Sequence, residues 1–219
     1  MLLAKKTIHL FLWLAIFCHT SLQSELVYGK YVDSITNDFC SYMETNHHLY
    51  CQGSGGRFLN NVSNIHLSFV SMQQGMTIDD ARSLLVECVE TLLQKINDDN
   101  QIKPYLSHYP YTVEGITLML SYESFPNTQS DNRLYPTVDF IFVDDSIVYY
   151  NRLNLSSQNY VTLLQEPYFL AHDKAILKNR FEEITKQTNI DKNVICNKIK
   201  QPSQSLLKKL KSFLTNKKL

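Results

Sequence analysis

The chain has 219 residues, 44% of them apolar, so it can bury one full hydrophobic core and is not a disordered chain. Its 21 Lys and Arg residues equal its 21 Asp and Glu residues, which leaves no overall charge that would favour nucleic acid as a partner. We therefore expect a single domain with terminal appendages.

The N-terminal residues 1–24 have the pattern of a secretory signal peptide. Lys5 and Lys6 precede an apolar run at 8–18, and a polar stretch follows at 19–24. The run is well short of the ~20 residues that span a bilayer as a helix, which favours cleavage over retention as an anchor. We therefore predict export, with the mature protein periplasmic, envelope-associated or secreted.

A helix and a polar loop are expected after the leader. Aromatic and apolar residues at helical spacing predict a first helix from about Lys30 to Glu44. The polar segment 46–57 follows and contains the glycine-rich cluster Gly53–Arg57. A phosphate-binding loop of this composition follows a strand and opens a helix, whereas this cluster leads into a strand. We therefore interpret it as a flexible turn.

The segment from Asn64 to Tyr122 has the clearest pattern in the chain. Apolar residues alternate with mostly polar ones at 65–70 and again from Ile116 to Tyr122, which predicts two half-buried strands. Between them, Thr77 followed three residues later by Asp80 predicts a helix N-cap. Apolar residues at three- and four-residue spacing follow, so a central helix with one buried stripe is expected.

Two more strands and a helix are predicted in the C-terminal half. Val138, Phe140 and Phe142 alternate with Asp139 and Ile141. This segment and the apolar run Ile147–Tyr150 flank the turn-forming residues Asp144–Ser146, which is typical of a tight hairpin. Glu166–Pro167 has the pattern of a helix start, and a charged, partly buried helix is expected to continue to Lys186.

Together these elements predict an α+β fold in which an antiparallel sheet of about four strands packs against the central helix, with flanking helices at both ends. We divide the chain into the signal peptide 1–24, the domain 25–190 and a basic tail 191–219. The tail holds eight Lys and one acidic residue, and its last segment predicts a basic amphipathic helix. That helix could contact an anionic membrane surface or a partner, or it could cover the protein's own sheet. The residues expected at the contact are Leu206, Lys208, Lys209, Leu210, Lys211 and Phe213.

Four cysteines follow the leader: Cys40, Cys51, Cys88 and Cys196. In an oxidising compartment they allow three pairings, and the sequence does not choose among them. Cys40 with Cys51 is the local pairing, and a bridge that closes a loop of this size stabilises by roughly 2 to 3 kcal/mol. Cys88 lies on the apolar stripe of the central helix, where we interpret it as a small core residue.

His47 and His48 lie between Cys40 and Cys51, so zinc ligation and a Cys and His nucleophile pair are alternatives to a surface loop closed by a disulfide. The spacing matches no common zinc pattern, and thiols of exported proteins tend to be oxidised, which favours the surface loop. No metal or cofactor is therefore expected.

Several short segments resemble a group of uncharacterised exported proteins from intracellular bacteria, including chlamydia-like and Legionella-like organisms. These segments are Gly53–Gly56, Ala81–Glu90, Ile96–Asn97, Ile102–Leu106 and Tyr109–Tyr111. The resemblance implies a compartment and a lifestyle, and it implies no reaction or catalytic residue.

For function, we expect an exported, non-enzymatic protein that binds an unidentified protein or envelope component, or a component of a host. The rival hypothesis is a small secreted hydrolase, or a thiol or metal enzyme, that uses Cys40, Cys51, His47 or His48. A third hypothesis is association with an anionic membrane surface through the basic tail helix.

Overall fold

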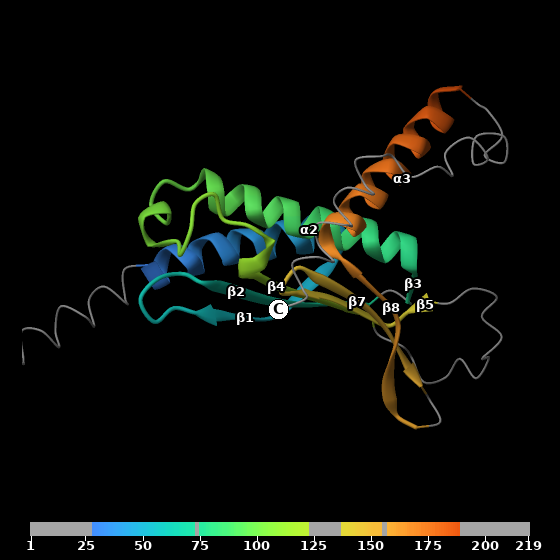
Figure 1. Cartoon of the computed structure of the whole chain (residues 1–219), viewed down its shortest axis with the longest axis horizontal. Helices are drawn as coiled ribbons and strands as arrows, with labels where there is room; N and C mark the ends of the chain where they lie inside the picture. Colours follow the sequence, from blue (N-terminus) through green and yellow to red (C-terminus); the bar gives the residue numbers. More distant parts are fainter. Residues whose placement is uncertain (1–27, 73–74, 123–136, 155–156, 189–219) are drawn as a thin grey trace, which may run out of the picture.

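The computed structural model of this chain describes residues 28–72, 75–122, 137–154 and 157–188. Within them, the predicted α+β class is confirmed: three helices accompany a six-stranded mixed sheet and a two-stranded sheet (Figure 1). The elements in chain order are a first helix at 28–47, β1 (Leu49–Arg57), β2 (Asn64–Ser71), β3 (Met76–Thr77), α2 (Ile78–Asp98), the short 3₁₀ helices η1 (Lys103–Tyr105) and η2 (Val113–Gly115), β4 (Ile116–Tyr122), β5 (Thr137–Val138), β6 (Phe140–Asp144), β7 (Ile147–Asn154), β8 (Asn159–Pro167) and α3 (Tyr168–Thr188).

The sequence predicts an antiparallel sheet, but the main sheet is mixed. Its strand order is β1-β2-β4-β6-β7-β8, and β2 pairs with β4 in parallel, from Ile65 opposite Ile116 to Ser71 opposite Tyr122. The other neighbouring pairs are antiparallel. The parallel pair arises because α2 carries the chain from the end of β2 back to its starting edge, as a crossover helix does.

The sequence analysis missed the two outer strands, β1 and β8. The predicted flexible turn at Gly53–Arg57 is instead part of β1, which forms an antiparallel hairpin with β2. Gly56 is required there, because a Cβ atom at this position would lie 2.1 Å from the carbonyl oxygen of Asn64. The predicted helix start at Glu166–Pro167 is also wrong: both residues end β8, and α3 begins at Tyr168.

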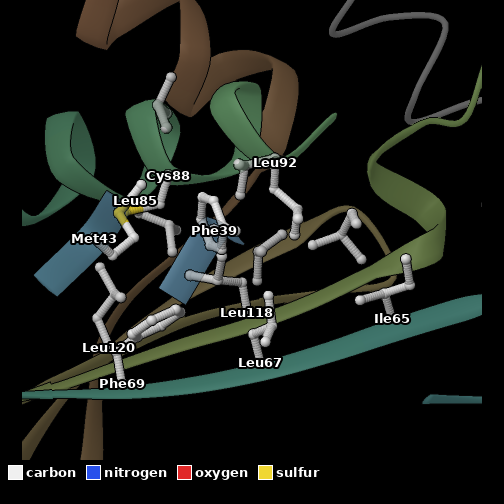
Figure 2. Packing of buried hydrophobic residues seen from close by; sticks show 14 of the residues in the cluster. Phe39, Met43, Ile65, Leu67, Phe69, Leu85, Cys88, Leu92, Leu118 and Leu120 are labelled. Carbon is white, nitrogen blue, oxygen red and sulfur yellow. The ribbon is translucent and has the colours of Figure 1, made fainter. Parts of the chain in front are cut away.

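The central helix has the predicted cap and the predicted buried stripe. Thr77 Oγ1 accepts a hydrogen bond from the backbone N–H of Asp80 at 3.2 Å. Cys88 is fully buried in the core, as predicted, with its Sγ 3.5 Å from Met43 Sδ of the first helix. The first helix, α2 and the sheet all contribute side chains to this core (Figure 2). The labelled residues are Phe39 and Met43 of the first helix, Leu85, Cys88 and Leu92 of α2, and Ile65, Leu67, Phe69, Leu118 and Leu120 of the sheet.

The helices lie on one face of the main sheet (Figure 1). Alternate residues of β2, β4, β6 and β7 face them and are fully buried, which confirms the alternation predicted for β2 and β4. Complete burial of one such aliphatic side chain stabilises the fold by about 1.5 to 3 kcal/mol. The residues in between on β4 and β6, on the opposite face of the sheet, are partly or fully exposed. We call this second surface the open face.

The predicted hairpin is also present. β6 and β7 pair from Phe140 opposite Asn151 to Asp144 opposite Ile147. Asp145 and Ser146 connect them with φ angles of 45° and 60°, so both central residues are left-handed, which suits the right-handed twist of the two strands.

Candidate functional site

Four aromatic side chains form a continuous cluster on β6, β7 and β8. They are Phe140, Phe142, Tyr149 and Tyr160, and we call them the aromatic ridge. Phe142 is directly opposite Tyr149 in the β6–β7 pairing, while the neighbouring residues Ile141 and Tyr150 are buried beneath the helices. Because side chains alternate along a strand, the ridge lies on the open face.

The rings of the ridge stack on one another. The centroid of Phe142 lies 4.5 Å from that of Tyr149 and 5.2 Å from that of Phe140, with planes inclined by only 10° and 18°. Tyr160 continues the row at 5.4 Å from Phe140 and is 59% exposed. Phe142 therefore lies nearly parallel to two neighbouring rings at stacking distance.

Polar side chains border the ridge. Thr162 donates a hydrogen bond to Asn151 Oδ1 at 2.8 Å, and Asn151 is only 5% exposed. The Nδ2 atom of Asn151 is buried and has no hydrogen-bond partner among the residues that the structure describes. Farther along the open face, Thr117 donates to Asp144 Oδ1 at 2.7 Å and accepts from Asn64 Nδ2 at 3.2 Å. An apolar centre with a polar margin is the usual anatomy of a protein-binding surface.

On the helix-covered side, the same strands hold a buried ionic network. Glu166 of β8 accepts hydrogen bonds from Arg82 Nε at 2.7 Å, from the Tyr150 hydroxyl at 2.6 Å and from Lys174 Nζ. Burial disfavours the charged carboxylate, but the hydrogen bonds from Lys174, Tyr150 and Arg82 outweigh it and hold the pKa of Glu166 below its usual range. Arg82 also donates to Asp79 in the first turn of α2. We call Arg82, Tyr150, Glu166 and Lys174 the Glu166 network; it joins α2, α3 and the last two strands.

An open pocket of about 500 Å³ lies between α2, the segment before β4 and the start of α3. Its wall groups bond to one another: the Tyr168 hydroxyl donates to Glu90 Oε1 at 2.8 Å, and the Asn97 side chain bonds both backbone groups of Tyr111. His172 Nε2 lies 3.8 Å from the same Glu90 oxygen. Burial, and secondarily Glu90, raise the pKa of Tyr168, which disfavours its ionisation. These contacts fasten α2 to its neighbours.

The Cys and His residues singled out in the sequence do not converge on one site. His47 Nε2 lies 3.3 Å from Glu87 Oε1 of α2, whereas His48 is exposed and left-handed, with φ of 54°, just past the end of the first helix. The predicted local pairing of Cys40 with Cys51 is not formed in this structure: both are free thiols, although Cys51 is near enough to contribute to the raised pKa of Cys40. Within the described ranges, no group of three or more His, Cys, Asp and Glu side chains is arranged to hold a metal ion.

The predicted membrane or partner contact of the tail, from Leu206 to Phe213, lies outside the described residues, and so do the leader and Cys196. Among the helices that the structure describes, none combines the length and the apolar character needed to cross a membrane. Comparison of the chain with protein-family models, curated proteins and solved structures finds no match.

Sequence reasoning predicted the strands that carry Phe140, Phe142 and Tyr149 but did not identify the ridge. The alternation at 138–142 indicated a strand with two kinds of face, and the aromatic residues on one of those faces were the available signal. Tyr160 belongs to β8, which was missed. The Glu166 network left no local signal, because Arg82 and Glu166 are 84 positions apart.

Proposed function

We propose that this protein is an exported, non-enzymatic binding module that engages a protein of the cell envelope or of a host through the aromatic ridge. The observation that supports this proposal is the row of contacting rings of Phe140, Phe142, Tyr149 and Tyr160 on the open face. The leader at 1–24 supports the export part of the proposal.

The geometry of the rings favours a protein partner. Phe142 already stacks on Phe140 and Tyr149, which leaves less of its ring available to stack on a nucleic-acid base or a sugar. Exposed ring edges attract carbonyl and carboxylate oxygens, and partly buried aromatic residues contribute much of the binding energy at protein interfaces. A protein surface that combines apolar side chains with backbone carbonyl groups meets both requirements.

The rival hypothesis of a thiol enzyme gains less support from the geometry. A catalytic cysteine reacts as a thiolate, so its pKa must be lowered. Burial, and secondarily the neighbouring Cys51, raise the pKa of Cys40 to about 12. Cys88 is fully buried, which raises its pKa and keeps reactants away.

Site-specific photocrosslinking in cells that export the protein tests the proposal. Photoreactive p-benzoylphenylalanine replaces Tyr160 in one variant and Tyr109 in a matched control, because both tyrosines are 59% exposed but only Tyr160 belongs to the ridge. We expect a discrete adduct with a second protein from position 160 and none from position 109. Adding Phe142→Ser should remove that adduct, while the circular dichroism spectrum stays unchanged.

Equal adducts from Tyr160 and Tyr109, or no adduct from position 160, would refute the aromatic ridge as a binding surface. An adduct with the mass of two copies of this chain would also contradict the proposal, because it requires a different protein as partner. Retention of the mass of residues 1–24 in the purified protein would refute export with leader cleavage.

A further inference from the structure

The two thiols Cys40 and Cys51 are brought together by the packing of the first helix on β1 and β2. Phe39 of the helix meets Phe69 of β2 edge to face, with ring centroids 5.7 Å apart. Cys51 is the direct partner of Phe69 in the β1–β2 pairing, and Cys40 follows Phe39. The ring contact therefore brings the two thiols close together, and Cys51 is near enough to contribute to the raised pKa of Cys40.

The two thiols differ in access to solvent. Cys51 is exposed on the outer strand of the described sheet, and its Sγ lies 3.8 Å from the carbonyl oxygen of Gly53. Cys40 is partly buried against the core, and burial is the main reason that its pKa is raised to about 12. A reagent in solution therefore meets Cys51 first, while Cys40 lies beside it on the more buried side.

We propose that Cys40 and Cys51 form a thiol–disulfide exchange site at which Cys51 reacts first with a low-molecular-weight organic disulfide and Cys40 then closes an intramolecular bridge. In the first step the Cys51 thiolate attacks one sulfur of the reagent, which releases one thiol and leaves a mixed disulfide on Cys51. In the second step the Cys40 thiolate attacks Cys51 Sγ and releases the second thiol.

Atoms and electrons balance across the two steps. The two cysteine thiols lose two electrons and two protons, and the reagent disulfide gains them as two free thiols. The bridge links the first helix covalently to β1, whose only described neighbour in the sheet is β2. It also selects one of the three pairings that the sequence leaves open. The inference does not depend on the proposed function, because the aromatic ridge lies on β6, β7 and β8.

Oxidised glutathione is the probe for the test. The reduced full-length protein is incubated with it, the remaining thiols are alkylated, and the products are mapped by peptide mass spectrometry. For the natural chain we expect a peptide that joins Cys40 to Cys51, with Cys88 left unmodified because it is fully buried. Cys40→Ser should accumulate glutathione on Cys51, since the second step is blocked.

Cys51→Ser supplies the decisive comparison, because only the less accessible thiol remains. We expect Cys40 in this variant to gain glutathione at least about tenfold more slowly than Cys51 does in Cys40→Ser, since the thiolate is the nucleophile. Equal rates would overturn the order of reaction, and absence of the Cys40–Cys51 peptide in the natural chain would overturn the site. Far-UV circular dichroism confirms that each variant is folded; if a serine variant is not, the corresponding Cys→Ala variant takes its place.

Discussion

Replacing Glu166 by Gln removes the only negative charge at the centre of the Glu166 network. The Glu166 and Arg82 side chains are 3% and 7% exposed, so solvent cannot take over the role of the lost charge. A Gln oxygen could still accept from Arg82 and Tyr150, but its amide group would face the Lys174 ammonium, where two donors oppose each other. Among the described residues, Arg82 would keep Asp79 as its one charged partner, and the Asp79 side chain is 70% exposed.

The expected loss follows from these contacts. Breaking a buried ion pair by removing one partner costs about 3 to 5 kcal/mol, and the surviving neutral hydrogen bonds place Glu166→Gln near the lower end, at about 3 kcal/mol. Domains of this kind have a free energy of unfolding of roughly 5 to 15 kcal/mol, so the change removes a large part of it. Glu182→Gln is the matched control: Glu182 is 41% exposed and lies 3.9 Å from Lys178, so about 0.5 kcal/mol or less is expected.

Urea unfolding followed by far-UV circular dichroism measures both variants. Tryptophan fluorescence is unsuitable, because the single Trp lies in the leader. The double variant Arg82→Met/Glu166→Gln completes the cycle and should lose less stability than the two single variants together, since removing both charges leaves neither unpaired. If Glu166→Gln lost no more stability than Glu182→Gln, the Glu166 network would not hold these elements together and this reasoning would fail.

Three further outcomes can be measured on the same protein. The pKa of Glu166 is lower in the folded chain than the ordinary value of 4.5, so its contribution to stability is present above pH 4.5 and is lost as the pH falls through the folded-state pKa. Measuring the urea midpoint at decreasing pH should show this loss for the natural chain and not for Glu166→Gln. Thr77→Ala removes the N-cap of α2 and should lower the free energy of unfolding by about 1 kcal/mol, whereas Thr77→Ser should restore most of it. Oxidation of Cys40 and Cys51 should raise the urea midpoint by the equivalent of about 2 to 3 kcal/mol relative to the reduced protein, and an unchanged midpoint would contradict the loop-closure argument.

The parts of the fold that the sequence predicted are those with a strong local pattern. Thr77 and Asp80 form the predicted cap because capping involves residues three positions apart. The strands Asn64–Ser71 and Ile116–Tyr122 bury one face, so their apolar residues alternate visibly. Asp145 and Ser146 form the predicted turn for an equally local reason.

The parts that the sequence did not predict depend on partners far along the chain. β1 and β8 lie at the outer edges of the sheet, where most side chains are exposed, so alternation is lost. In β1, the glycines at 53, 55 and 56 have no side chain, so the sequence there shows no alternation of apolar and polar residues. The parallel pairing of β2 with β4 depends on where α2 returns the chain, and the strand patterns alone are the same for either direction.

The aromatic ridge and the Glu166 network meet in adjacent residues of β7. Tyr149 points to the open face and stacks on Phe142, while Tyr150 points to the helices and donates to Glu166. The pairing of β7 with β8, the strand that carries Tyr160, is therefore anchored from the helix side by Glu166. Since side chains of one strand alternate between faces, any movement of β7 that opened the buried network would also shift the ridge. The buried Glu166 network therefore also holds in place the strands that carry the proposed binding surface.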